Sequence, residues 1–150
     1  SYHSTAFAKR LQARKGLAIA FGQALQMTNI LKDSPEDQAR GVSWKPADIS
    51  QSDLLRIAYE KLQDSMQYIL LIPKQDSGIR RFCFLAFGLA VMTLSKIAKR
   101  TKFNHQSEVK LSRRTVMTFY TFTGLAVHSD LLMKSFFYYS SKVLRKFARA

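Results

Sequence analysis

The sequence predicts an all-α protein. Apolar residues recur at spacings of three and four along most of the 150 residues, as in helices that bury one face. The alternation of apolar and polar residues that marks a half-buried strand is weak and confined to residues 108–112. At 47% apolar and 12% aromatic, the composition favours a folded helical domain over a disordered chain.

The first expected helix covers residues 4–33. Its apolar positions, spaced by three and four residues, include Leu11, Leu17, Ala18, Phe21, Leu25, Thr28 and Ile30. Ser34 and Pro35 then predict a break or a bend, because proline lacks an amide hydrogen and crowds the preceding turn. As an alternative, Ser34 caps a new short turn with Pro35 in its first position.

Three further helices are expected. Residues 38–52 form a loop, after which a helix over 53–72 is capped by Ser52 and ended by Pro73. The next helix is expected from Gly78 to Lys99. A polar, hairpin-like connector over residues 100–114 leads to the last expected helix, from Thr115 to Phe147.

The most apolar run, residues 82–94, predicts a buried core helix. It has 13 residues bounded by basic side chains, whereas a membrane-spanning helix needs about 20. The one cysteine, Cys83, excludes an internal disulfide framework and is typical of a reducing compartment.

The charge indicates an anionic partner. The net charge of +14 is concentrated in residues 77–150, which carry fourteen basic side chains against Glu108 and Asp130. Phosphate groups, acidic lipid and nucleic acid all fit such a charge. The basic residues are not gathered into a known nucleic-acid-binding motif, so nucleic acid is not expected as a partner.

The stretch "QMTNILKDSPEDQARG", residues 26–41, carries the candidate chemistry. Gln26, Asn29 and Asp33 share one helix face, and Asp37 joins them if the helix continues past Pro35. Carboxylate and amide oxygens without cysteine or histidine suit Mg²⁺, which takes one or two protein carboxylates and further oxygens from phosphates. The alternative to a metal site is an ordinary solvated helix end. Acidic residues near a helix C-terminus interact mildly unfavourably with the helix dipole, and this favours the functional interpretation slightly.

The stretch over residues 22–46 resembles the second aspartate-rich motif of the squalene and phytoene synthases, the head-to-head prenyltransferases. That motif reads L-Q-x-x-N-I-[LI]-[RK]-D-x-x-E-D-x-x-x-G, followed by an aromatic residue and a proline. The matching positions are Leu25, Gln26, Asn29, Ile30, Leu31, Lys32, Asp33, Glu36, Asp37, Gly41, Trp44 and Pro46. Two positions depart from the pattern: Val42 stands where the family usually has arginine, and Pro35 lies between the acids.

The resemblance continues to about residue 125. The segment "IRRFCFLAFGLAVMTL" resembles the apolar helix of squalene synthases, with Ala86 where those proteins often have proline. It implies that Phe82 and Cys83 line a hydrocarbon pocket, with Ala86, Leu89 and Ala90 nearby on the same face. The segment "EVKLSRRTV" resembles the basic segment that follows in the same family and includes Lys110, Arg113 and Arg114.

The resemblance implies an isoprenoid-synthase helical bundle and a two-step reaction. Two farnesyl diphosphates are joined through a cyclopropyl (presqualene) diphosphate, and reduction by NADPH then gives squalene. Asn29, Asp33 and Asp37 are implied as Mg²⁺ ligands, and Asp33 and Asp37 as the catalytic residues. The implied substrate contacts are Gln26, Lys32, Arg40, Phe82 and Cys83, and the implied NADPH contacts are Lys110, Arg113 and Arg114.

Alternatives remain open. A phytoene or dehydrosqualene synthase would use no NADPH, and a non-catalytic relative would serve as an assembly or interaction protein. Family members carry a first aspartate-rich motif about a hundred residues before the second, and residues 1–150 contain none. The chain, which starts with Ser1, is therefore expected to be the C-terminal half of one such domain, with the first motif upstream or on another chain. A cytoplasmic location is expected, and residues 134–150 suit peripheral membrane attachment as well as an ordinary terminal helix.

Overall fold

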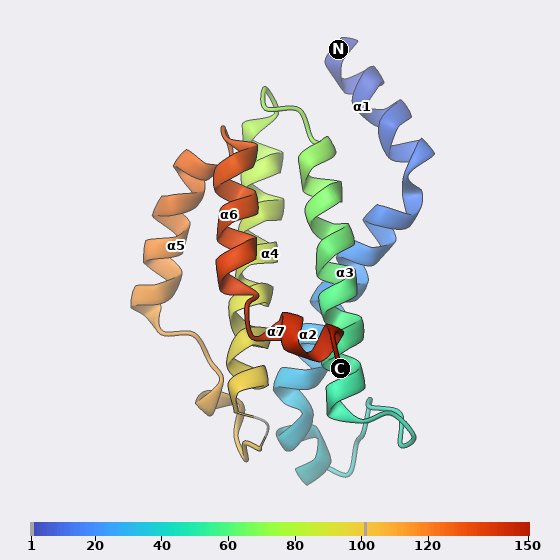
Figure 1. The fold of residues 1–150 in the computed structure, drawn as a ribbon, viewed down its shortest axis with the longest axis vertical. Coiled ribbons are helices and arrows are strands. Elements are labelled where there is room, and N and C mark those ends of the chain that lie inside the picture. Colours follow the sequence, from blue (N-terminus) through green and yellow to red (C-terminus); the bar gives the residue numbers. More distant parts are fainter. Residues whose placement is uncertain (1, 101) are drawn as a thin grey trace.

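Helices make up the regular structure of the described chain, which comprises residues 2–100 and 102–150 of a computed structural model (Figure 1). Within those residues there are seven α-helices, one short 3₁₀ helix and no strand, so the all-α prediction is confirmed. Ser1 and Thr101 lie outside the described residues. The helices are α1 (Tyr2–Ala13), α2 (Lys15–Ala39), α3 (Gln51–Leu71), α4 (Ser77–Lys99), η1 (Gln106–Glu108), α5 (Arg113–Ala126), α6 (Asp130–Ser140) and α7 (Leu144–Ala148).

The expected single helix over residues 4–33 is wrong in two ways: it is broken at Arg14, and its last part extends beyond Pro35. The chain turns at Arg14, just before Gly16, whose backbone freedom disfavours helix, and so α1 and α2 are separate. At the other end, α2 continues through Pro35 to Ala39. Pro35 removes one backbone hydrogen bond close to the helix end, and Arg40 closes that end with bonds from its N–H to the carbonyls of Glu36 and Asp37, at 3.2 and 3.1 Å.

The predictions for α3 and α4 are largely confirmed. α3 begins two residues earlier than expected because Ser50, rather than Ser52, is its cap. The Ser50 hydroxyl accepts the Asp53 N–H at 3.1 Å and donates to the Asp53 carboxylate at 2.6 Å. This bond to the Asp53 side chain lowers the pKa of that carboxyl. α4 matches its expected range within one residue.

The single helix expected from Thr115 to Phe147 is also wrong. The chain reverses after Ala126, and the Ser129 hydroxyl caps α6 by accepting the Leu132 N–H at 3.3 Å. This reversal lets α5 and α6 each place a phenylalanine against α4, which one straight helix could not do. A second turn, at residues 141–143, sends α7 across α3.

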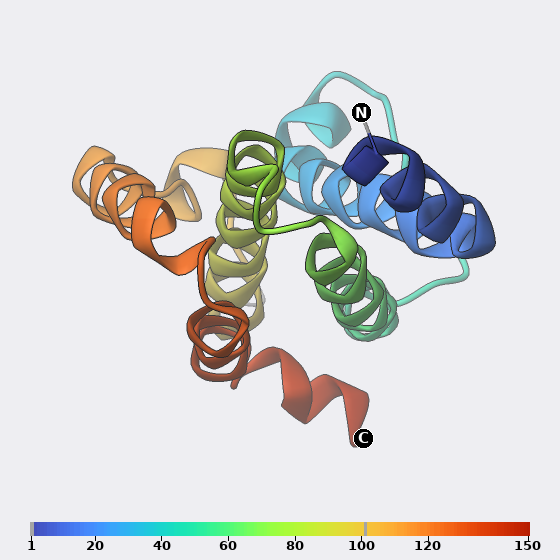
Figure 2. The same ribbon diagram turned by 90° about the horizontal axis from the view of Figure 1, so that it is seen from above.

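α4 is the central helix of the fold. It contacts α2 and α3 on one side and α5 and α6 on the other, as the view from above shows (Figure 2). α2 packs along α3 and α4 through buried residues, most of them small, which allow a close approach of the helix axes. These residues are Ala20, Ala24, Thr28 and Leu31.

Aromatic rings hold α4, α5 and α6 together. The Phe84 ring lies 5.6 Å from the centroids of both Phe119 and Phe136, and the latter two rings are 4.7 Å apart. Gly88 makes this possible, because a Cβ there would lie 2.0 Å from the Phe119 ring. The cluster fixes α5 and α6 on the face of α4 that is turned away from α2.

Arg80 ties three elements together at one end of the bundle. It is 1% exposed, and its guanidinium donates to the Ile72 carbonyl at the end of α3, at 2.7 Å, and to the Asp130 carboxylate at the start of α6. Burial of a charged group requires such pairing.

α4 is long and apolar enough, by length and composition alone, to cross a membrane. In the most apolar part of this helix, 56% of the residues are buried inside the protein, as is typical of a core helix.

Candidate functional site

One face of α2 presents the polar side chains of the acidic motif. Because the helix is unbroken at Pro35, Asn29, Asp33 and Asp37 follow one another on this face with a drift of about 40° per step. Gln26 lies on the same face, one turn before Asn29. Gln26 and Asn29 are exposed and the two aspartates are half-buried, so their oxygens are accessible.

The basic residues of the motif lie beside these acids. The Lys32 ammonium is 3.5 Å from an Asp33 carboxylate oxygen, in a half-exposed pair that contributes little to stability. Arg40 caps the C-terminus of α2, and its side chain is exposed. After it, Gly41 takes a left-handed backbone conformation, with φ of 75°, and the Val42 N–H returns to the Asp37 carbonyl at 2.8 Å. The end of the motif is therefore held in a defined turn.

A shallow groove of about 270 Å³ opens beside this face, between α2 and α4. From α2 it is lined by Leu25, Thr28, Asn29 and Lys32, and from α4 by Ala86, Leu89, Ala90 and Thr93. Asn29 and Lys32 of the motif thus border the same space as Ala86, Leu89 and Ala90, the residues that the resemblance placed on one face of α4. Asp33 and Asp37 do not line the groove. Its walls are mostly hydrocarbon, with Asn29 and Lys32 at its polar side.

Phe82 and Cys83 are not among the residues that line this groove. Phe82 is 72% exposed and lies one turn before Ala86, on the same stripe of α4. Cys83 instead points into the core, where it is 7% exposed. Only Phe82 of this pair has a surface that a ligand can reach directly.

The burial of Cys83 predicts low thiol reactivity. Burial raises the pKa of the Cys83 thiol above its ordinary value, so the reactive thiolate is scarce at neutral pH. The folded chain is expected to react with a maleimide at least about tenfold more slowly than the chain unfolded in guanidinium. Mass spectrometry of timed samples measures this directly, since Cys83 is the one thiol of the chain. Equally rapid labelling of folded and unfolded chains would contradict the buried position.

Glu36 attaches the basic connector to α2. One of its carboxylate oxygens accepts the Gln106 N–H of η1 at 2.8 Å, across 70 residues of sequence. Its other oxygen, Oε2, is buried and has no hydrogen-bond partner among the described residues. Sequence reasoning gave Glu36 no role beyond matching the motif, because the partner is a backbone amide that no side-chain pattern reveals.

Removing this carboxylate is expected to loosen the connector. A hydrogen bond to a charged acceptor contributes about 1.5–3 kcal/mol, so Glu36→Ala should speed hydrogen exchange at the Gln106 amide by roughly tenfold or more. Glu60→Ala is the matched control, because it removes only the exposed 3.2 Å pair with Arg56 on α3. Unchanged exchange at Gln106 in the Glu36 variant would show that the connector is held by other contacts.

Lys110, Arg113 and Arg114 follow this anchored turn. All three are exposed, and the Lys110 carbonyl accepts a hydrogen bond from the Lys96 ammonium at 2.8 Å. Arg113 and Arg114 form the first turn of α5, which the Ser112 hydroxyl caps by accepting the Thr115 N–H at 3.1 Å. The start of this helix therefore combines backbone N–H groups with two guanidinium groups, and both kinds of group can bind an anion.

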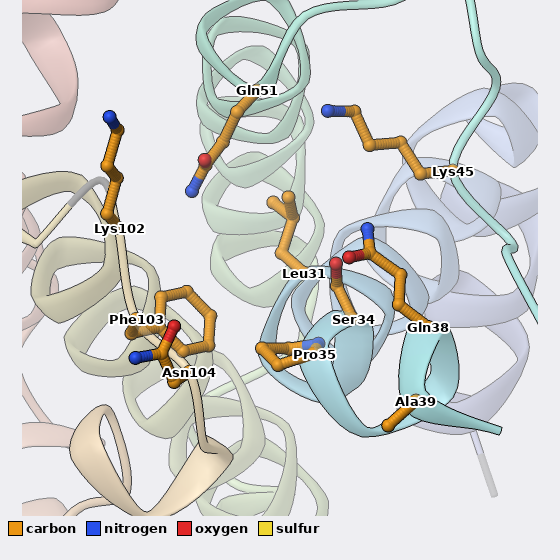
Figure 3. Close-up of a pocket in the computed structure, with 10 residues that line it drawn as sticks. All are labelled: Leu31, Ser34, Pro35, Gln38, Ala39, Lys45, Gln51, Lys102, Phe103 and Asn104. Atoms are coloured by element: carbon orange, nitrogen blue, oxygen red, sulfur yellow. The ribbon is translucent and has the colours of Figure 1, made fainter.

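A larger cavity of about 610 Å³ lies on another face of α2 (Figure 3). Leu31 and Phe103 lie in its middle, with the ammonium groups of Lys45 and Lys102 toward its edges. The remaining residues that line it are Ser34, Pro35, Gln38, Ala39, Gln51 and Asn104. Neither Asn29 nor Asp33 borders this cavity, so it is separate from the acidic face.

Within residues 2–100 and 102–150, no three His, Cys, Asp or Glu side chains gather closely enough to hold a metal ion. The oxygens of Asn29, Asp33 and Asp37 nevertheless fit Mg²⁺ in kind, because this ion needs few protein ligands when phosphates and water supply the rest. Asn29 and Asp37 are eight residues apart, or about 12 Å along the helix axis. One ion with ligands at about 2.1 Å therefore cannot contact both.

Residues 2–54 match the squalene/phytoene synthase family. The matched range spans α1, α2 and the start of α3, and so includes the whole acidic motif. It supports a relationship to these prenyltransferases for the part of the chain that carries Asn29, Asp33 and Asp37. Residues 55–150, with the apolar helix and the basic segment, lie beyond the match. Comparisons with curated proteins and with solved structures found no match.

Proposed function

We propose that this chain forms the C-terminal half of the active site of a squalene synthase, which condenses two farnesyl diphosphates head to head. The observation that carries the proposal is the position of the acidic face of α2 beside an apolar groove. An allylic diphosphate needs both: oxygen ligands and cations for its head, and a dry apolar surface for its chain. The family match over residues 2–54 supports the same class of reaction.

The acidic face would hold the diphosphate head through Mg²⁺. Asn29 and Asp33, one turn apart, would hold one ion, and Asp37 would reach a second ion directly or through water. Bound Mg²⁺ would act as a Lewis acid that stabilises the negative charge of the departing diphosphate. Asp33 and Asp37 are the proposed catalytic residues, as carboxylates that hold Mg²⁺, and Gln26 is a proposed substrate contact.

Lys32 and Arg40 would contact the diphosphate oxygens. Lys32 is paired with the Asp33 carboxylate and also lines the groove, so a phosphate oxygen there could replace or extend its present pair. Arg40 offers a planar guanidinium at the end of α2. Both cations would position the leaving group close to the acidic face.

The groove would hold the prenyl chain and exclude water from the reacting carbons. Ala86, Leu89 and Ala90 supply its apolar wall, and the exposed ring of Phe82 extends the same stripe of α4 by one turn. An aromatic face can also stabilise a carbocation. Cys83 would support this wall from the core side.

The basic segment would bind the phosphates of NADPH. Lys110, Arg113 and Arg114 are exposed, and the Glu36–Gln106 hydrogen bond fixes the connector before them against the helix that carries the acidic face. This bond ties the connector that leads to α5 to the helix that would hold the diphosphate. NADPH would supply the hydride that distinguishes squalene from dehydrosqualene.

A complete site requires a second set of acidic ligands. We propose that a first aspartate-rich motif, upstream in the native polypeptide or on another chain, faces α2 and completes the ion sites. The proposed cellular location is the cytoplasm. No nucleic acid takes part in this reaction.

Product analysis of the full native polypeptide tests the function. It would be incubated with farnesyl diphosphate and Mg²⁺, with and without NADPH, and the extracted hydrocarbons identified by mass spectrometry. Squalene formed only with NADPH is the expected result. Dehydrosqualene irrespective of NADPH would overturn the reductive step, and absence of hydrocarbon from farnesyl or geranylgeranyl diphosphate would overturn the enzymatic role in favour of an interaction protein.

A further inference from the structure

α6 is apolar on both of its faces. Its inner face packs into the core through Met133, which is fully buried, and through Phe136 and Phe137. Its outer face is exposed and carries two pairs of apolar residues that are seven positions, or about two helical turns, apart. These outer residues are Leu131, Leu132, Tyr138 and Tyr139, which are 73%, 42%, 59% and 75% exposed. The exposed Lys134 lies between Leu131 and Tyr138 on this outer face, which therefore combines apolar side chains with a positive charge.

The neighbouring helix α5 extends this outer surface. Met117 and Leu125 are 62% and 72% exposed, and α5 contacts α6 and runs antiparallel to it (Figure 1). We name these exposed apolar side chains of the two helices, taken together, the α5–α6 face. It consists of Met117, Leu125, Leu131, Leu132, Tyr138 and Tyr139.

The charge around the α5–α6 face is positive. Residues 109–150 contain eight lysines and arginines, and their one acidic residue is Asp130. Asp130 is paired with Arg80 and lies 4.0 Å from the Lys74 ammonium, so its charge is offset. Exposed basic side chains lie on the same helices or directly after them. They are Arg114, Lys134, Lys142 and Lys146.

The aromatic residues are arranged for a boundary between apolar and charged surroundings. The Arg145 guanidinium lies 3.9 Å from the centroid of the Tyr138 ring. The adjacent Tyr139 ring is 75% exposed. Tyrosine rings at the level of lipid headgroups, with arginine and lysine next to them, are typical of proteins at membrane surfaces.

We propose that the α5–α6 face binds the surface of an anionic lipid bilayer. Leu131, Leu132 and Leu125 would insert among the acyl chains, Tyr138 and Tyr139 would lie at the headgroups, and the surrounding lysines and arginines would contact lipid phosphates. Nucleic acid would use the charge but leave the six apolar side chains uncovered. A second copy of the chain would bring the same positive charges together, which is unfavourable.

Vesicle co-sedimentation of the full chain tests this proposal. The probes are vesicles of phosphatidylcholine alone and of phosphatidylcholine mixed with phosphatidylglycerol, each at low and high salt. Binding is expected only with phosphatidylglycerol, and it should weaken at high salt. The double variants Leu131→Ser/Tyr139→Ser and Lys142→Glu/Lys146→Glu are each expected to reduce the partition coefficient by about tenfold or more.

The matched control is Ile19→Ser/Lys9→Glu. It changes an exposed apolar residue of α2 and an exposed lysine of α1. It should bind vesicles as the wild type does, and circular dichroism should show that all variants remain helical. Absence of binding to anionic vesicles at low salt, or equal loss in the control, would overturn the proposal. Light scattering would test for a dimer. A dimer that dissociates in the Leu131→Ser/Tyr139→Ser variant, together with no binding to vesicles, would overturn the proposal and assign the face to self-association.

Discussion

Replacing Asp33 by Asn is expected to lower kcat/KM of the native polypeptide by roughly 10³-fold with farnesyl diphosphate. Asp33 lies at the middle of the acidic face, one turn from both Asn29 and Asp37. Asn keeps the size of the side chain but removes the negative charge, which weakens its bond to Mg²⁺. The Mg²⁺ concentration at half-maximal rate should rise in the same variant.

This loss should not come from unfolding. Asp33 is 39% exposed and its one ion pair, with Lys32, is weak, so its replacement should change the free energy of unfolding by less than about 1 kcal/mol. Asp64→Asn is the control, since Asp64 is an exposed carboxylate on α3. A rate for the Asp33 variant within a few-fold of the control would contradict a catalytic role for the acidic face.

Replacing Phe84 by Ala is expected to destabilise the fold by about 3–5 kcal/mol. Phe84 is fully buried, and its ring contacts Phe87, Phe119 and Phe136 on three helices. Its removal leaves a cavity where α4, α5 and α6 meet. Thermal unfolding followed by circular dichroism should show a midpoint lower by about 10 °C.

Phe82→Ala is the matched control on the same helix. The Phe82 ring is 72% exposed, so its loss should cost well under 1 kcal/mol. Equal destabilisation by the two changes would show that the aromatic cluster does not hold the helices together. The two variants also separate stability from substrate contact, because only Phe82 reaches the surface of the α4 stripe.

Local patterns in the sequence predicted most of the helices. The three- and four-residue spacing of apolar side chains located α3 and α4 within one or two residues, since each buries a continuous stripe. The same spacing misled at Arg14 and in the expected helix from 115 to 147, and the rule that proline ends a helix misled at Pro35. In those places, tertiary contacts decide where a helix ends. Helix propensity is too weak to override such contacts, so a local pattern does not predict these helix ends.

The acidic face could be predicted because its residues belong to one helix. Once α2 is continuous, a spacing of four residues places Asn29, Asp33 and Asp37 together. The groove with Ala86, Leu89 and Ala90 depended on the resemblance, because it joins two helices that are distant in sequence. The Glu36–Gln106 hydrogen bond and the buried position of Cys83 emerged only from the packing.

Release of inorganic pyrophosphate from farnesyl diphosphate is the measurement that tests the proposed diphosphate site most directly. It reports loss of the leaving group and does not depend on which hydrocarbon forms afterwards. The native polypeptide is expected to release pyrophosphate only when Mg²⁺ is present, and Asp33→Asn should abolish nearly all of this release. Pyrophosphate release that is independent of Mg²⁺, or equal in the wild type and the Asp33 variant, would contradict the assignment of the α2 face as the diphosphate site.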